Sequence, residues 1–150
     1  MSDRNSHWEP RRRARRRALQ ALYQREITGD PVDGIIIQFV DTQDFSGVDT
    51  DYFKALVHGV DSERESLSEQ LGPVLDREFG KLDTMERLLL LIGTWQYRFE
   101  PEVPFQVVVD ETVDLANRFG SAQSPSYVNA VLDKAAGAFG LPGAARHSDG

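Results

Sequence analysis

The residues best suited to chemistry in this 150-residue chain are arginines crowded into one short run. They are Arg11, Arg12, Arg13, Arg15, Arg16 and Arg17. A guanidinium group presents a planar fork of N–H donors that matches the oxygens of a phosphate. The whole chain has a net charge of −7, yet residues 1–30 hold eight basic and four acidic residues, a charge of +4. The run therefore predicts a local anion-binding surface on an otherwise acidic protein, and it excludes a basic coat over the whole molecule.

Signatures of catalysis and of metal binding are absent from the sequence. There is no cysteine, and the three histidines lie far apart, so the chain offers no thiolate site and no histidine pair at metal-ligand spacing. Asp110, Glu111 and Asp114 form a small acidic cluster. This cluster is better interpreted as a solvated helix face than as a site for a divalent cation. We therefore expect no enzyme activity, no cofactor and no metal.

The arginine run is expected on a helix that begins at Pro10 and ends before Gly29. Proline suits a first helical turn because its missing N–H would be unpaired there anyway. Apolar side chains gather on one side of this helix, namely those of Leu19, Leu22, Tyr23 and Ile27. The arginines instead point in nearly all directions, so the first two turns should project beyond the body. A solvated helix end is the alternative, but six cations near a helix N-terminus oppose the macrodipole, which favours a bound polyanion.

The remaining sequence predicts an all-α bundle of about six or seven helices in a single domain. Residues 49–71, 82–99 and 124–139 show helical spacing, and the run Leu88–Ile92 makes 82–99 the central buried helix. Residues 33–41 fit either a helix or a strand, and Val107–Val109 could begin a strand before helical spacing resumes. We expect the domain to span residues 10–140, with flexible tails at 1–9 and 141–150.

No segment of the sequence predicts contact with a membrane. The longest apolar run is far shorter than the roughly 20 residues that span a bilayer. The first ten residues lack the apolar core of a secretion signal. We therefore expect a cytoplasmic protein.

Four stretches make the chain resemble the NusB family of bacterial transcription antitermination factors. They are RRRARRRALQALYQREITGD (11–30), VDTDYFKALVHGV (48–60), DETVDLANRFG (110–120) and SYVNAVLDKAA (126–136). They occur in the order and spacing of that family, and the resemblance runs from about Arg11 to Phe139. It implies an all-α fold with two packed helical halves.

The resemblance also implies a function and a set of contact residues. Members of the family bind single-stranded boxA RNA together with the ribosomal small-subunit protein NusE. The pair joins an RNA polymerase antitermination complex that supports transcription of ribosomal RNA operons. The RNA-binding residues implied here are Arg11, Arg12, Arg13, Arg15, Phe119, Gln123 and Tyr127, and the same run adds Arg16. The partner-binding residues implied are Tyr23 and Glu86.

Two other functions stay open from the sequence alone. The first is a protein-interaction module that does not bind RNA, for which the arginines would contact an acidic protein. The second is the NusB-like part of a ribosomal RNA methyltransferase, although the chain shows no methyl-donor motif.

Overall fold

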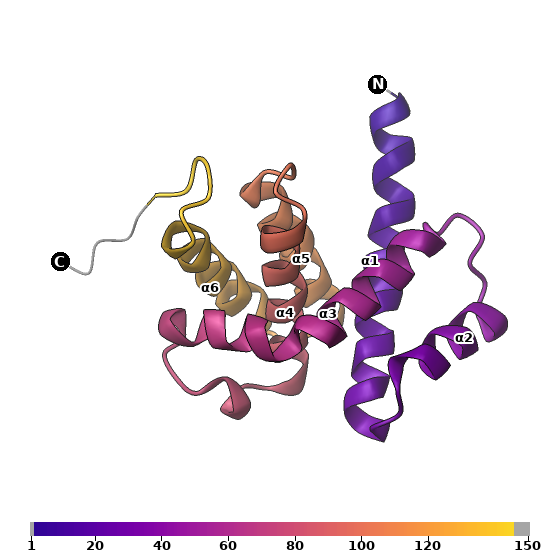
Figure 1. Ribbon diagram of the computed structural model, residues 1–150. Helices are drawn as coiled ribbons and strands as arrows, with labels where there is room; N and C mark the ends of the chain where they lie inside the picture. Colours follow the sequence, from indigo (N-terminus) through magenta and orange to yellow (C-terminus); the bar gives the residue numbers. More distant parts are fainter. Residues whose placement is uncertain (1, 146–150) are drawn as a thin grey trace. The chain divides into compact units, whose positions relative to one another are not determined.

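The computed structural model describes the backbone of residues 2–145, and side chains from Trp8 onward (Figure 1). This part of the chain contains no strand, which confirms the all-α fold. Its α-helices are α1 (Ser2–Thr28), α2 (Val32–Thr42), α3 (Thr50–Leu71), α4 (Thr84–Phe99), α5 (Phe105–Phe119) and α6 (Ser124–Ala138). Two short 3₁₀ turns, η1 (Gly72–Val74) and η2 (Phe79–Lys81), connect α3 to α4.

The chain divides into two compact units, in agreement with the two helical halves that the family resemblance implies. The first unit ends at Ser62 and the second begins at Glu63, so the boundary falls within α3. In the first unit α1 packs against α2, and the ring of Phe53 on α3 lies 6.1 Å from that of Phe39 and 5.0 Å from that of Phe45. In the second unit α4, α5 and α6 pack against one another.

Helix α4 is the buried centre of the second unit, as its apolar run predicts. Residues 88–92 are fully buried. The carboxylate of Asp83 accepts hydrogen bonds from the backbone N–H groups of Met85 and Glu86, which leaves fewer unpaired donors in the first turn. Not every apolar residue of this helix is buried, since Phe99 at its end is half exposed.

The structure corrects one local prediction and decides two that the sequence left open. Helix α1 begins at Ser2 rather than at Pro10, which lies inside it. A proline within a helix removes a hydrogen-bond donor but does not always end the helix. Residues 33–41 and Val107–Val109 are helical, as parts of α2 and α5. Short apolar runs fit both strands and buried helices, so their spacing alone could not decide between these structures.

Candidate nucleic-acid interface

The arginines of α1 divide into accessible and buried side chains. Arg13 is exposed, and Arg11, Arg12 and Arg16 are partly exposed. Arg12 and Arg13 each form an ion pair with Glu9, at 3.4 Å and 3.6 Å. Such exposed pairs contribute about 0–1 kcal/mol, so a phosphate can replace the carboxylate at little cost.

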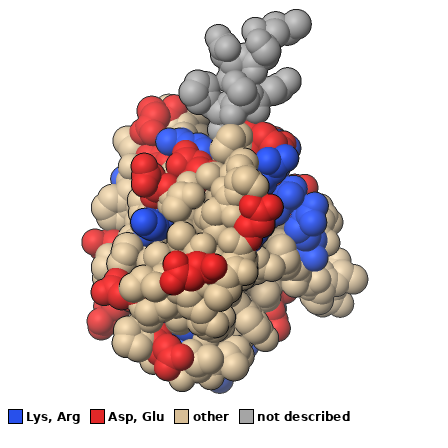
Figure 2. All heavy atoms as spheres, turned by 90° about the vertical axis from the view of Figure 1, so that its right-hand side faces the viewer, with Lys and Arg blue, Asp and Glu red and all other residues tan. Residues whose placement is uncertain are grey.

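Arg11 and Arg13 are also held by the loop between α2 and α3 and by the start of α3. The guanidinium of Arg11 lies 4.5 Å above the ring of Tyr52. The Nη1 group of Arg13 donates a hydrogen bond to the carbonyl oxygen of Gly47 over 3.3 Å. These contacts hold both guanidinium groups near the surface of the first unit. In Figure 2 basic side chains gather on part of the visible face, with acidic side chains directly beside them.

The prediction that Arg15 projects into solvent is wrong. Its exposed fraction is 1%, and its guanidinium lies 5.6 Å from the centre of the Tyr52 ring. Arg15 precedes Leu19 by four residues and Leu22 by seven, so all three lie on the buried face of α1. Arg15 is therefore part of the buried face of α1 and not of its accessible surface.

In the second unit, the predicted residues Phe119, Gln123 and Tyr127 lie around the corner that joins α5 to α6. Phe119 ends α5 and is partly buried, and Gln123 is exposed directly before α6. Tyr127 is partly buried, one residue before the core residue Val128. This corner therefore offers one exposed amide and two rings at the edge of the core, a combination suited to unpaired bases.

Glu86 contacts the same corner through a buried serine. The hydroxyl of Ser124 donates a hydrogen bond to Oε2 of Glu86 over 2.9 Å. The same hydroxyl oxygen accepts the backbone N–H of Ser121 over 3.1 Å. Glu86, predicted to bind a protein partner, therefore also fixes the loop that precedes α6.

The second unit adds two residues to this surface that the sequence did not indicate, Asp76 and Arg77. The hydroxyl of Tyr127 donates a hydrogen bond to Oδ1 of Asp76 over 3.4 Å. The guanidinium of Arg77 lies 5.5 Å from the centre of the Tyr127 ring, within the range of a cation–π contact. Partial burial and then the charge of Asp76 raise the pKa of Tyr127, so the phenol stays protonated at neutral pH. No sequence motif surrounds Asp76 and Arg77, and Asp76 lies 51 residues before Tyr127 in the chain.

Tyr23 and Ile27 are more exposed than the helical pattern of α1 predicts. Tyr23 has 39% of its surface exposed and Ile27 has 65%. They are four residues apart and therefore lie on one face of α1. Tyr23 and Ile27 thus form an exposed apolar face on α1.

The described residues contain no cluster of three or more metal-ligating side chains. Asp110 and Asp114, the two acids on one face of α5, are both exposed. Within the same part of the chain, every helix is too short or too polar to cross a membrane.

Comparison with known proteins gives one consistent family. The NusB family model matches residues 12–137. A transcription antitermination protein NusB from Alcanivorax borkumensis is 45% identical over 126 residues, which cover 84% of each chain. A protein of the same name from Actinobacillus succinogenes is 38% identical over 140 residues, 93% of this chain and 99% of that protein. The solved structure of Thermotoga maritima NusB superposes with a TM-score of 0.76 and 25% identity, over 85% of this chain and 90% of that one. The chain therefore belongs to the NusB family.

Proposed function

We propose that this protein is a cytoplasmic transcription antitermination factor that binds single-stranded boxA RNA together with the ribosomal protein NusE. It acts as an adaptor without catalysis, within an RNA polymerase antitermination complex on ribosomal RNA operons. Its relatives at 38–45% identity are named as transcription antitermination proteins. The observation that supports RNA binding best is the corner between α5 and α6, where Tyr127 is partly exposed beside the exposed Gln123.

The RNA-binding residues in this proposal are Arg11, Arg12, Arg13, Arg16, Phe119, Gln123 and Tyr127. The arginines supply contacts to phosphates, which raise affinity for any RNA sequence. The rings and the amide at the corner contact bases, and only these contacts can distinguish boxA from another sequence. Each unit of the protein therefore has its own part in the proposed function.

The protein partner in this proposal is NusE, bound through Tyr23, Ile27 and Glu86. Tyr23 and Ile27 offer exposed apolar surface, which commonly marks a binding site. Residues 31–150 hold nine basic and 20 acidic residues, a charge of −11 that suits a basic ribosomal protein. Partner binding and RNA binding are thus assigned to different side chains.

The experiment that tests this proposal measures RNA affinity with and without NusE. The probes are a boxA oligoribonucleotide and a scrambled oligoribonucleotide of the same composition, at one fixed salt concentration. We expect weak boxA binding by the protein alone, tighter binding with NusE, and a preference for boxA over the scrambled RNA. Binding to NusE without any preference for boxA would instead identify a protein-interaction module.

A further inference from the structure

The connection between η1 and η2 places a pair of opposite charges against Tyr127. Asp76 and Arg77 belong to this four-residue connection, which lies between Val74 and Phe79. Asp76 reaches the hydroxyl of Tyr127, and Arg77 covers part of its ring. All three residues lie in the second unit. The aromatic residue proposed to contact RNA thus has a cation directly beside it.

The contact between Asp76 and Arg77 has the geometry that arginine also adopts with phosphate. Nε of Arg77 donates to Oδ1 of Asp76 over 3.1 Å, and Nη2 donates to Oδ2 over 3.0 Å. Two parallel N–H donors on two oxygens form the same fork that binds a phosphate group. The carboxylate therefore occupies the donors that RNA would use.

This pair is exposed and can be opened at low cost. The exposed fraction is 52% for the side chain of Arg77 and 63% for that of Asp76. Exposed ion pairs of this kind add little to stability. The hydrogen bond from Arg77 lowers the pKa of Asp76, so the carboxylate is charged at neutral pH and competes with phosphate.

We propose that Arg77 is an additional RNA-binding residue and that Asp76 is its internal competitor. In the complex the guanidinium of Arg77 binds a phosphate of the strand whose base stacks on Tyr127. In the free protein Asp76 holds Arg77 over the ring and must release it before RNA can bind. This inference rests on the proposed function, because it requires RNA at the corner between α5 and α6.

The proposal predicts opposite effects for two neighbouring substitutions. Arg77→Ala weakens boxA binding and reduces the slope of log affinity against log salt by about 0.7, as expected for one lost phosphate contact. Asp76→Asn keeps the shape of the side chain but removes its charge, and it tightens boxA binding by up to about fivefold, the upper range for an exposed ion pair. In the Arg77→Ala background, Asp76→Asn has little effect, because the two residues act through one contact.

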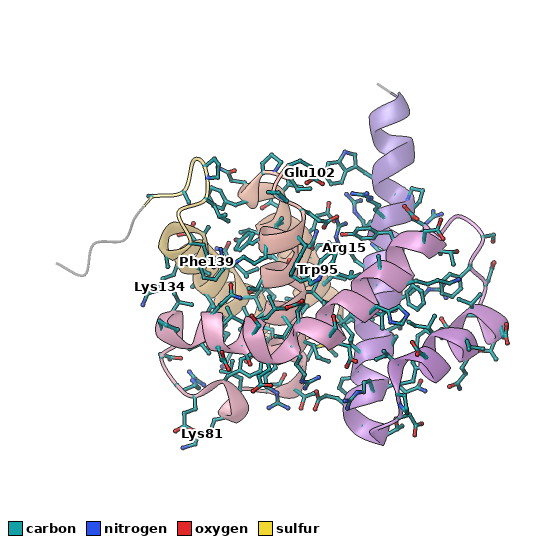
Figure 3. All side chains as sticks on the ribbon, in the orientation of Figure 1. Arg15, Lys81, Trp95, Glu102, Lys134 and Phe139 are labelled. Carbon is teal, nitrogen blue, oxygen red and sulfur yellow. The ribbon has the colours of Figure 1, made fainter. Side chains whose placement is uncertain are left out.

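Two nearby substitutions serve as matched controls. Glu78→Gln removes an exposed acid two residues from Asp76, and Lys81→Ala removes an exposed cation whose side chain extends away from the ribbon in Figure 3. Both controls should change boxA affinity less than the corresponding substitutions of Asp76 and Arg77. Equal effects of Glu78→Gln and Asp76→Asn would overturn the proposal, since they would show only a general response to charge.

The measurements use the full chain with NusE present, and the melting temperature of each variant shows that it is folded. Wild-type protein without preference for boxA would refute the proposed function and this inference with it. If the wild type prefers boxA but Asp76→Asn fails to tighten binding, only the inference is wrong. An unchanged affinity for Arg77→Ala would also refute the inference alone.

Discussion

Tyr127 shows how one side chain can serve both a core and a surface. It lies next to the core residue Val128 in α6 and keeps part of its ring exposed. Stacking of a base on an aromatic ring contributes about 1–3 kcal/mol. We therefore expect Tyr127→Ala to lower boxA affinity by about one to two decades. Tyr127→Phe should have little effect, because the ring remains and the lost hydrogen bond to Asp76 is long and exposed.

The same variants separate a binding role for Tyr127 from a structural one. Thermal unfolding and boxA affinity are measured on each variant side by side. If Tyr127→Ala lowers the melting temperature while the folded fraction keeps wild-type affinity, then the ring is only part of the core.

Single residues also show where prediction from sequence failed. Arg15 has the helical spacing of a core residue relative to Leu19 and Leu22, but its charge led to the opposite prediction. Tyr23 and Ile27 have apolar side chains and were assigned to the core side, yet both are exposed. For Arg15 residue type and helical position disagreed, whereas for Tyr23 and Ile27 both indicated the core side. Only the packing of α1 against its neighbours could decide whether these side chains are buried.

At the scale of elements, α1 carries the phosphate contacts of the proposed function. Arg12 and Arg13 are the test residues, because their exposed ion pairs with Glu9 contribute little to folding. Replacing both with alanine should weaken binding to boxA and scrambled RNA alike. It should also reduce the salt slope by about 0.7 for each lost contact.

The control for these arginines is Lys134→Ala. Lys134 is an exposed cation on α6 whose side chain extends outward in Figure 3. Its removal should leave the salt slope unchanged within error. Titrations at several salt concentrations measure the slope, and an unchanged slope for the arginine variant would show that this part of α1 is only a solvated helix.

The corner between α5 and α6 depends on the absence of a side chain at Gly120. A Cβ atom there would lie 2.6 Å from Cβ of Ser124 and 2.9 Å from the carbonyl oxygen of Ala116. Such distances cannot be kept, so Gly120→Ala must shift the buried serine that bonds to Glu86. We expect a loss of about 1–3 kcal/mol in the free energy of unfolding, typical of overpacking.

At a second glycine, Gly34, we expect substitution by alanine to raise the free energy of unfolding. Gly34 lies inside α2, and a Cβ atom there would meet nothing within 4 Å. Gly34→Ala should therefore stabilise the protein by about 0.5–1 kcal/mol, because alanine favours the helical backbone. Denaturant unfolding of both variants gives the comparison. Stabilisation by Gly120→Ala would contradict the close packing described for this corner.

The elements themselves were largely predictable, and their ends were less so. The spacing of apolar residues identified the helices now seen as α3, α4 and α6. Helix α2 was ambiguous because its apolar run is short. The candidate residues on α1, α5 and α6 could be named from the sequence because the family resemblance covers those stretches. The contact of Tyr127 with Asp76 and Arg77 joins distant parts of the chain and has no local signal.

For the whole molecule, the distribution of charge should control the rate at which NusE binds. The basic run lies in the first 30 residues, whereas the remaining residues have a charge of −11. Opposite charges on two partners accelerate their encounter, and salt screens this effect. We therefore expect the association rate with NusE to fall as sodium chloride is raised from 50 to 500 mM, concentrations on either side of the roughly 0.15 M physiological ionic strength.

Stopped-flow mixing at several salt concentrations measures the association rate and the dissociation rate of the complex with NusE. The dissociation rate should change less than the association rate, because it depends mainly on the short-range contacts. An association rate that does not vary with salt would show that the acidic part of the chain does not attract NusE.

Helix α3 has a consequence for fragments of this protein. Figure 1 draws α3 as one uninterrupted helix, and the boundary between the two units falls between its residues Ser62 and Glu63. A chain cut at this boundary would leave helical pieces of 13 and nine residues from the 22 of α3. Isolated helices shorter than roughly 12–15 residues are marginal in water. Only the nine-residue piece falls below this length, so we expect a fragment that begins at Glu63 to lose part of its first helix, and the border between the units is a poor place to divide the chain.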